Sequence, residues 1–159
     1  MLGPLFSLVV MASASSQKIS SSAVDVYGDW EIVAHRALGI SAMSSEEAKQ
    51  WVGGKASYSD SMATFIDESC DSPSYHWSSV TTEQFSQSFR VSPETLGIKA
   101  TSIGIITVLC QGEDWFAPGS VLIKKNQDTF FTIWDGIFFE LERHRSAIEF
   151  GFGLRYANR

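Results

Sequence analysis

The chain has little of what nucleic-acid binding, metal binding and catalysis require. Only 12 of its 159 residues are Lys or Arg, against 18 Asp and Glu, which gives a net charge of −6. This charge argues against nucleic acid and anionic membranes as partners, because both attract clustered basic residues. The three histidines have no metal-ligand spacing, and no Gly-x-Ser-x-Gly elbow or glycine-rich phosphate loop occurs. We therefore predict a protein without metal or cofactor, and place a hydrolase of unknown type third behind two kinds of binding protein.

No apolar run is long enough to cross a bilayer as a helix. The N-terminal candidate, residues 1–16, is shorter than the roughly 20 residues that a span needs, so we predict no stable membrane insertion. It ends in Ala12-Ser13-Ala14, which has the form of a signal-peptidase site. We predict a signal peptide over 1–14, a flexible Ser-rich lead-in over 15–25, and an exported protein, periplasmic or secreted. Because no Lys or Arg stands near the start of the run, an uncleaved N-terminal arm is the alternative.

Cysteine is scarce as well. The chain contains only Cys70 and Cys110. In the oxidising compartment that export implies, these two residues can form one intrachain disulfide. The alternative is a pair of buried free thiols. A metal site is not expected, because neither cysteine has a second Cys or a His at ligand spacing.

Apolar and aromatic side chains are plentiful. Hydrophobic residues make up 44% of the chain and aromatic residues 13%, which suffices for one packed core in a chain of this length. We predict a single folded domain over residues 26–145. The last residues, 146–159, contain an alternating apolar pattern and are predicted to be a C-terminal tail or an edge strand.

Hydrophobic periodicity predicts mainly strands. Alternating apolar residues indicate strands over 28–35, 55–66 and 75–80, the second interrupted by Ser59-Asp60-Ser61. The run over 103–110 is apolar on both faces, so it predicts a central strand that is covered on both sides. The expected fold is a mainly β one, either a β-barrel or a strongly curved antiparallel sheet.

Two or three short helices are expected between these strands. Ser44 begins a capping box before a helix over 45–52, with Ala48, Trp51 and Val52 on one face. A second capping box begins at Thr81 and precedes a helical apolar stripe. Residues 92–97 combine a cap, an early proline and a terminal glycine into one helical turn.

The strongest local pattern is a hairpin near the C-terminal end. Asp135-Gly136 stands between two apolar runs and suits a two-residue type I′ turn, which requires positive φ angles. The turn fixes the strand register and divides the side chains into two faces. One face is predicted to be core and holds Phe130, Trp134, Ile137, Phe139 and Leu141. The other face carries Phe131, Ile133 and Phe138, so a helix, a second sheet or a binding partner must cover it.

Three further aromatic residues lie next to predicted loops and turns. Tyr75, Trp77 and Trp115 are candidates for partly exposed side chains, and such aromatic residues commonly anchor ligands or proteins. The alternative is that they pack at the rim of the barrel.

Gly28-Asp29-Trp30, at the head of the first strand, resembles the Gly-x-Trp motif of lipocalins and other calycin barrels. In that family the Trp closes one end of the barrel, and a basic residue from a late strand lies over it. The resemblance implies an antiparallel barrel in which Arg143 or Arg145 stacks on Trp30 through a cation–π interaction. The two predicted helices between early strands depart from the usual lipocalin order of elements.

Two functions fit these patterns. A filled barrel would act through its outside as an inhibitor, an immunity factor or a surface antigen, with a protein partner at Phe131, Ile133 and Phe138 or at the 75–77 loop. A hollow barrel would instead carry a small apolar ligand, as lipocalins do. Large inward side chains tend to fill a small barrel, so we expect the first function. An apolar cavity of ~300 Å³ or more would indicate the second.

Overall fold

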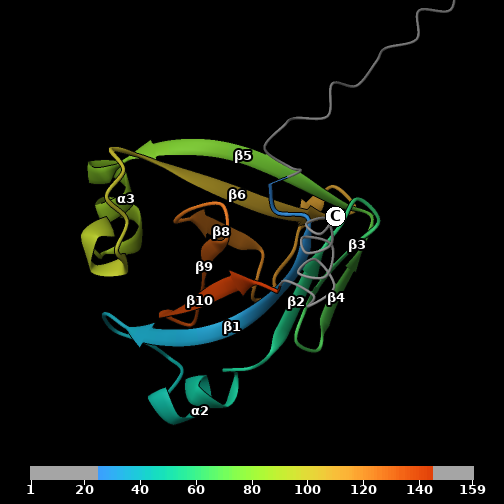
Figure 1. The fold of residues 1–159 in the computed structure, drawn as a ribbon, viewed down its shortest axis with the longest axis horizontal. Coiled ribbons are helices and arrows are strands. Elements are labelled where there is room, and N and C mark those ends of the chain that lie inside the picture. Colours follow the sequence, from blue (N-terminus) through green and yellow to red (C-terminus); the bar gives the residue numbers. More distant parts are fainter. Residues whose placement is uncertain (1–24, 145–159) are drawn as a thin grey trace, which may run out of the picture.

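The computed structural model describes residues 25–144, which form one curled antiparallel sheet with two α-helices and one 3-10 helix (Figure 1). The elements in chain order are β1 (Gly28–Ala37), α2 (Ser45–Gln50), β2 (Lys55–Tyr58), β3 (Met62–Phe65), β4 (Glu68–Asp71), β5 (Pro73–Thr81), α3 (Thr82–Phe89), η1 (Pro93–Leu96), β6 (Ser102–Cys110), β7 (Glu113–Asp114), β8 (Val121–Lys124), β9 (Thr129–Trp134) and β10 (Ile137–Arg143). No helix among these is long and apolar enough to span a membrane.

The strands run β4-β3-β2-β1-β10-β9-β8-β6-β5 across the sheet, and the short β7 pairs with β6. Consecutive strands are paired from β1 to β4 and from β8 to β10, and β10 returns to pair with β1. The sheet therefore curls into a half-barrel, with β5 and β6 arching over β8, β9 and β10 in Figure 1. This arrangement confirms the mainly β fold class.

The two edges of the sheet are adjacent in the chain. β4 ends at Asp71 and β5 begins at Pro73, although these strands lie at opposite ends of the sheet. Cys70 of β4 and Cys110 of β6 form a disulfide, with their Cα atoms 5.5 Å apart. The predicted disulfide is therefore confirmed, and the free-thiol alternative is wrong. The bond fastens one end of the curled sheet to the other.

Large side chains fill the concave side of the half-barrel. Trp30 packs edge to face on Phe130 with the ring centroids 5.0 Å apart, and Trp51 stacks on Phe139 at 4.9 Å. Tyr58 is also buried, and its hydroxyl donates a hydrogen bond to the carbonyl of Gly119 at 3.0 Å. The same core contains the buried aliphatic side chains of Ile32, Ile106, Val108, Leu122, Ile137 and Leu141.

A second core lies on the opposite, convex face, where α3 and η1 cover β6, β8, β9 and β10. Phe131 and Phe138 pack there against Phe85 of α3 and Leu96 of η1, and both are essentially buried. Ile133 is partly buried beside them. A helix is thus the cover that this face needs, and Phe131 and Phe138 are core residues rather than an exposed contact surface.

The predicted hairpin is confirmed in its register. Ile137 lies opposite Trp134, and Asp135 and Gly136 have φ angles of 47° and 82°, as a type I′ turn requires. Both capping boxes are also present. The Ser44 side chain accepts from the Glu47 backbone, and the Thr81 side chain accepts from the Gln84 backbone.

Several expectations need correction. Residues 55–66 form two strands, because the Ser59 hydroxyl binds both the N–H and the carbonyl of Met62 and closes a turn. Val52 is exposed, since α2 ends at Gln50 and its helical periodicity no longer applies. Trp134 is only partly buried. β6 is next to the edge strand rather than central. The predictions for residues 1–24 and 145–159 lie outside the described residues.

Candidate functional site

Trp77, one of the predicted contact residues, lies on the edge strand β5 with 41% of its side chain exposed. It follows Tyr75 by two residues on the same strand, so it points to the same, concave side of the sheet. Its indole ring rests on the backbone of β6 at Gly104, where a Cβ atom would overlap the six-membered ring. Only glycine at position 104 leaves room for the ring at this place.

A cation that is paired with an anion lies over the Trp77 ring. The Nζ atom of Lys124 lies 5.7 Å from the ring centroid, within the range of a cation–π interaction. The same Nζ is 2.7 Å from Oδ2 of Asp25, so the two charges are paired. We call the group formed by Trp77, Gly104, Lys124 and Asp25 the Trp77 site. It combines a positioned aromatic surface with polar groups at its rim.

Tyr75 has a structural role beside this site. Its ring lies 5.4 Å from that of Tyr27 and 6.4 Å from that of Tyr58, both edge to face. Its hydroxyl donates to the carbonyl of Ser59 at 2.6 Å. Burial raises the pKa of Tyr75 above its ordinary value, so the hydroxyl stays protonated. Tyr75 therefore fixes the beginning of β5.

The third predicted aromatic residue, Trp115, is buried in the concave core with 9% exposure. Its neighbour Phe116 is 88% exposed. The sequence contains no pattern that separates these two residues, because the loop between β7 and β8 has no regular periodicity. Trp115 therefore belongs to the core, and Phe116 is an isolated aromatic side chain at the surface.

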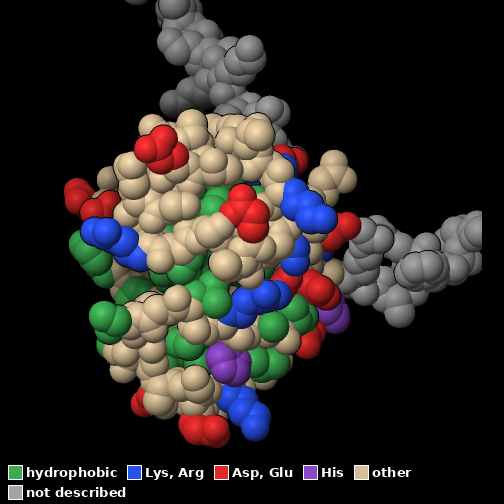
Figure 2. All heavy atoms as spheres, turned by 90° about the vertical axis from the view of Figure 1, so that its left-hand side faces the viewer, with side chains coloured by type: hydrophobic (Ala, Val, Ile, Leu, Met, Phe, Trp, Pro, Cys, Tyr) green, Lys and Arg blue, Asp and Glu red, His purple; other side chains and the backbone are tan. Residues whose placement is uncertain are grey.

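An apolar groove lies between the β1–α2 loop, the end of α3 and the β9–β10 hairpin. Its volume is about 220 Å³, and Ile40 on its rim is fully exposed. Figure 2, which views the molecule from the α3 side, shows hydrophobic side chains in a hollow of this face. The groove is lined by Gly39, Ile40, Phe89, Arg90, Val91, Ile133, Gly136 and Phe138.

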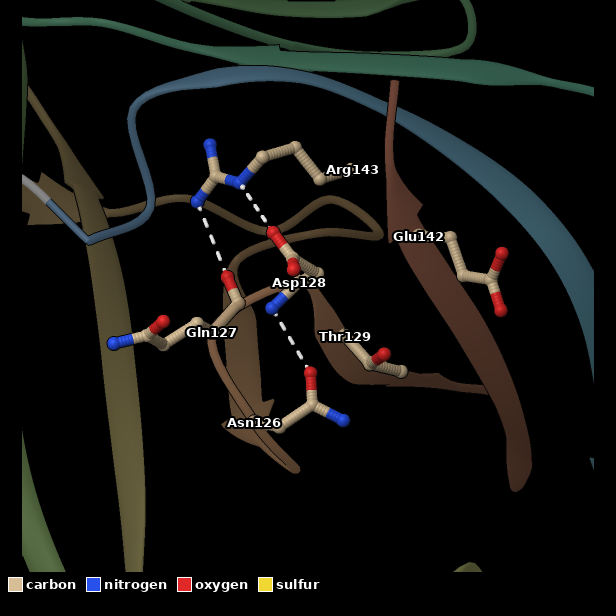
Figure 3. Close-up of a pocket in the computed structure, with 6 residues that line it drawn as sticks. All are labelled: Asn126, Gln127, Asp128, Thr129, Glu142 and Arg143. Carbon is tan, nitrogen blue, oxygen red and sulfur yellow. Dashed lines mark hydrogen bonds and ion pairs between the residues drawn. The ribbon is translucent and has the colours of Figure 1, made fainter. Parts of the chain in front are cut away.

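A polar pocket of about 630 Å³ surrounds Arg143 at the other end of β10 (Figure 3). The Arg143 guanidinium lies 4.3 Å from the Trp30 ring, donates to the carbonyls of Tyr27 and Asp25 at 2.7 and 2.6 Å, and contacts Asp128 at 3.5 Å. The contact that the resemblance implied for Arg143 or Arg145 is thus made by Arg143. Because its donors are bound within the protein, Arg143 has a structural role.

A second ion cluster lies on the convex face. Glu140, which is buried, accepts hydrogen bonds from Lys125 at 2.7 Å and from Arg36 at 3.1 Å. Both cations lie over the ring of Phe131. Burial alone would raise the pKa of Glu140, but the hydrogen bonds and charges of Lys125 and Arg36 outweigh it and lower the pKa. The members are far apart in sequence, so no sequence pattern indicates the cluster.

The described residues contain no obvious centre for metal chemistry. Within 25–144, no three His, Cys, Asp or Glu side chains are grouped so that they could hold a metal ion. In the same range, no buried side-chain nitrogen or oxygen lacks a hydrogen-bond partner.

The sequence predicted the partial exposure of Trp77 but not the groups around it. A glycine inside an apolar strand often marks a close approach by another group, so Gly104 was a usable signal. No sequence pattern indicated that Lys124 and Asp25 form an ion pair, because 99 residues separate them along the chain. Comparisons with protein-family models, with curated proteins and with solved structures found no match for this chain.

Proposed function

We propose that this protein is an exported, non-catalytic binding protein that contacts a protein partner at the Trp77 site. The observation that carries the proposal is a contrast between tryptophans. Trp30 is fully buried in the concave core, whereas Trp77 is 41% exposed at the edge of the sheet. An exposed tryptophan needs an explanation, because aromatic residues of this kind dominate the binding energy of protein interfaces.

The local geometry suits a binding anchor. The six-membered ring of Trp77 lies close against Gly104, and the Lys124 ammonium lies over the ring. A ring that is already fixed loses little conformational entropy when a partner covers it. The Lys124–Asp25 pair supplies the polar rim that protein interfaces typically have around an apolar centre.

A carrier of a small apolar ligand has less support. Pockets for such ligands typically enclose about 300–1,000 Å³. The pocket between Trp51, Phe65 and Trp134 measures about 200 Å³, and aromatic side chains pack across the concave side. A protein that acts through its outside, as an inhibitor, an immunity factor or a surface antigen does, fits a filled half-barrel better.

Export is part of the proposal. The Cys70–Cys110 disulfide connects the two ends of the sheet, and structural disulfides persist mainly in oxidising compartments. The sequence pattern of residues 1–14 points the same way.

The test is an affinity capture from the extracellular and envelope fractions of the source organism, followed by binding measurements with the purified partner. Wild type is compared with Trp77→Ala and with Phe116→Ala, which removes an exposed aromatic side chain elsewhere. We expect Trp77→Ala to weaken the partner's affinity by about 30-fold, as loss of a hot-spot residue does, and Phe116→Ala to have little effect. Gly104→Ala should weaken it too, because the added methyl displaces the ring. Equal binding by all four proteins would overturn the proposal.

A further inference from the structure

The outer edge of β5 is a long row of backbone hydrogen-bonding groups that has no neighbouring strand among residues 25–144. β5 has nine residues and lies at the end of the sheet, paired only with β6 within residues 25–144. The opposite edge strand, β4, has only four residues. A row of unpaired N–H and C=O groups is a template for pairing with another chain, and proteins usually protect such edges.

β5 lacks three of the features that usually protect an edge strand. Common devices are charged side chains, prolines within the strand, and bulges that twist the edge away. β5 contains no Asp, Glu, Lys or Arg, its one proline is its first residue, and its register with β6 runs through nine pairs without a bulge. β4, by contrast, carries Glu68 and Asp71 within its four residues. The β4 edge is therefore short and charged, which opposes pairing with another strand. The β5 edge is long and has none of these three protections.

We propose that β5 pairs in antiparallel fashion with β5 of a second copy, which joins two half-barrels into one continuous sheet across a twofold axis. This inference rests on the proposed function, because it names the partner that covers Trp77. Twofold pairing brings the same strand together in both copies. An uncharged strand meets no like-charge repulsion in such a pair, whereas β4 would bring Glu68 and Asp71 of both copies together.

The position of Trp77 supports the pairing of β5 with a second copy of the chain. It is the middle residue of β5, so an axis near it lets all nine residues overlap. The two Trp77 side chains then lie on the same side of the joined sheet and within contact distance. Each would lose part of its 41% exposure. Because each copy has a net charge of −6, added salt should strengthen the association by screening their repulsion.

The test is sedimentation velocity of the full mature protein at increasing concentration. Wild type is compared with Ser78→Lys on β5 and with the matched control Ser69→Lys on β4; both serines are exposed. We expect a wild-type dimer that strengthens with salt, a dissociation constant raised at least tenfold by Ser78→Lys, and no change with Ser69→Lys. A second measurement needs no variant. The backbone amide hydrogens of β5 should exchange with solvent more slowly at high than at low concentrations of the wild-type protein.

Three results would overturn the self-pairing. They are a wild type that stays monomeric up to its solubility limit, a dimer that both lysine variants weaken equally, and a dimer whose β5 amides exchange as fast as in the monomer. If Trp77→Ala still abolishes binding of a different protein in any of these cases, only the self-pairing fails. If no binding event depends on Trp77, the proposed function fails as well.

Discussion

Arg143 connects two separate segments of the chain to the face of Trp30. Its guanidinium stacks on the indole and donates to carbonyls of the segment before β1 and of the turn before β9. The Gly-x-Trp motif and a late Arg predicted the stacking. The hydrogen bonds to carbonyls could not be predicted, because backbone positions carry no signature in side-chain sequence.

Replacing Arg143 by Met keeps a long apolar stem but removes the cation and its donors. We expect a loss of about 2–3 kcal/mol in the free energy of unfolding, since hydrogen bonds to charged groups and cation–π contacts each contribute at that scale. Urea denaturation measures it. Lys99→Met, at an exposed position, is the control and should change the midpoint little. A loss equal to that of the control would contradict the structural role of Arg143.

Glu140 makes stability depend on pH in the acidic range. Its pKa is lowered from 4.5 in the folded protein, against the effect of burial, by its bonds to Lys125 and Arg36. A lowered folded pKa stabilises the protein above pH 4.5, and this contribution is lost as the pH falls through the folded pKa. We expect Glu140→Gln to cost about 1–3 kcal/mol at neutral pH and to flatten the stability profile below about pH 4.5. The measurement is the urea midpoint of wild type and of Glu140→Gln at a series of pH values. Parallel plots of midpoint against pH for the two proteins would contradict this role of Glu140.

Among the helices and strands, the sequence predicted best those whose position is set by a turn or by a helix cap. Asp135-Gly136 fixed the hairpin register, and both capping boxes began real helices. The identity of the cover over Phe131 and Phe138 was not predictable, because a helix, a second sheet and a partner all satisfy the same apolar pattern. The turn at Ser59 was visible only as a polar interruption of a strand.

Two glycines with similar φ angles allow the energetic cost of backbone strain to be measured apart from the cost of a steric clash. Gly136 and Gly112 have φ angles of 82° and 85°. A Cβ at Gly136 would meet the backbone of Ile40 and Ser41, whereas one at Gly112 meets nothing within 4 Å. We expect Gly112→Ala to cost about 1 kcal/mol from strain alone, and Gly136→Ala about 2–4 kcal/mol because the β1–α2 loop must also move. Equal costs by thermal or urea unfolding would show that the loop contact carries no energy.

At the scale of the whole molecule, the disulfide restrains the curled sheet. Cys70 and Cys110 are 40 residues apart and link β4 to β6 across the two ends of the sheet. We expect the Cys70→Ala/Cys110→Ala double variant to lose up to about 4 kcal/mol on the chain-entropy model, while it keeps its sheet. Reductant should destabilise wild type by the same amount and leave the double variant unchanged. A reductant effect on both proteins would contradict this explanation.

The sequence predicted the fold class better than the site. Apolar alternation and the cysteine count indicated a curved β-sheet with one disulfide, because both depend on neighbours along the chain or on a single possible pairing. Of the predicted contact residues, Trp77 is exposed, while Trp115, Phe131 and Phe138 are buried. Alternation shows which residues share a face, but exposure depends on which distant segment covers that face.

Aromatic side chains fill the half-barrel, and we propose that the protein acts through its surface at Trp77. The most direct test is a titration of the protein with a fluorescent long-chain fatty acid, followed through quenching of tryptophan fluorescence in wild type and in Trp77→Ala. A filled interior predicts no saturable one-to-one binding and no quenching of the tryptophans that remain in Trp77→Ala. Stoichiometric binding with equal quenching in both proteins would place the ligand in the concave core and contradict the claim.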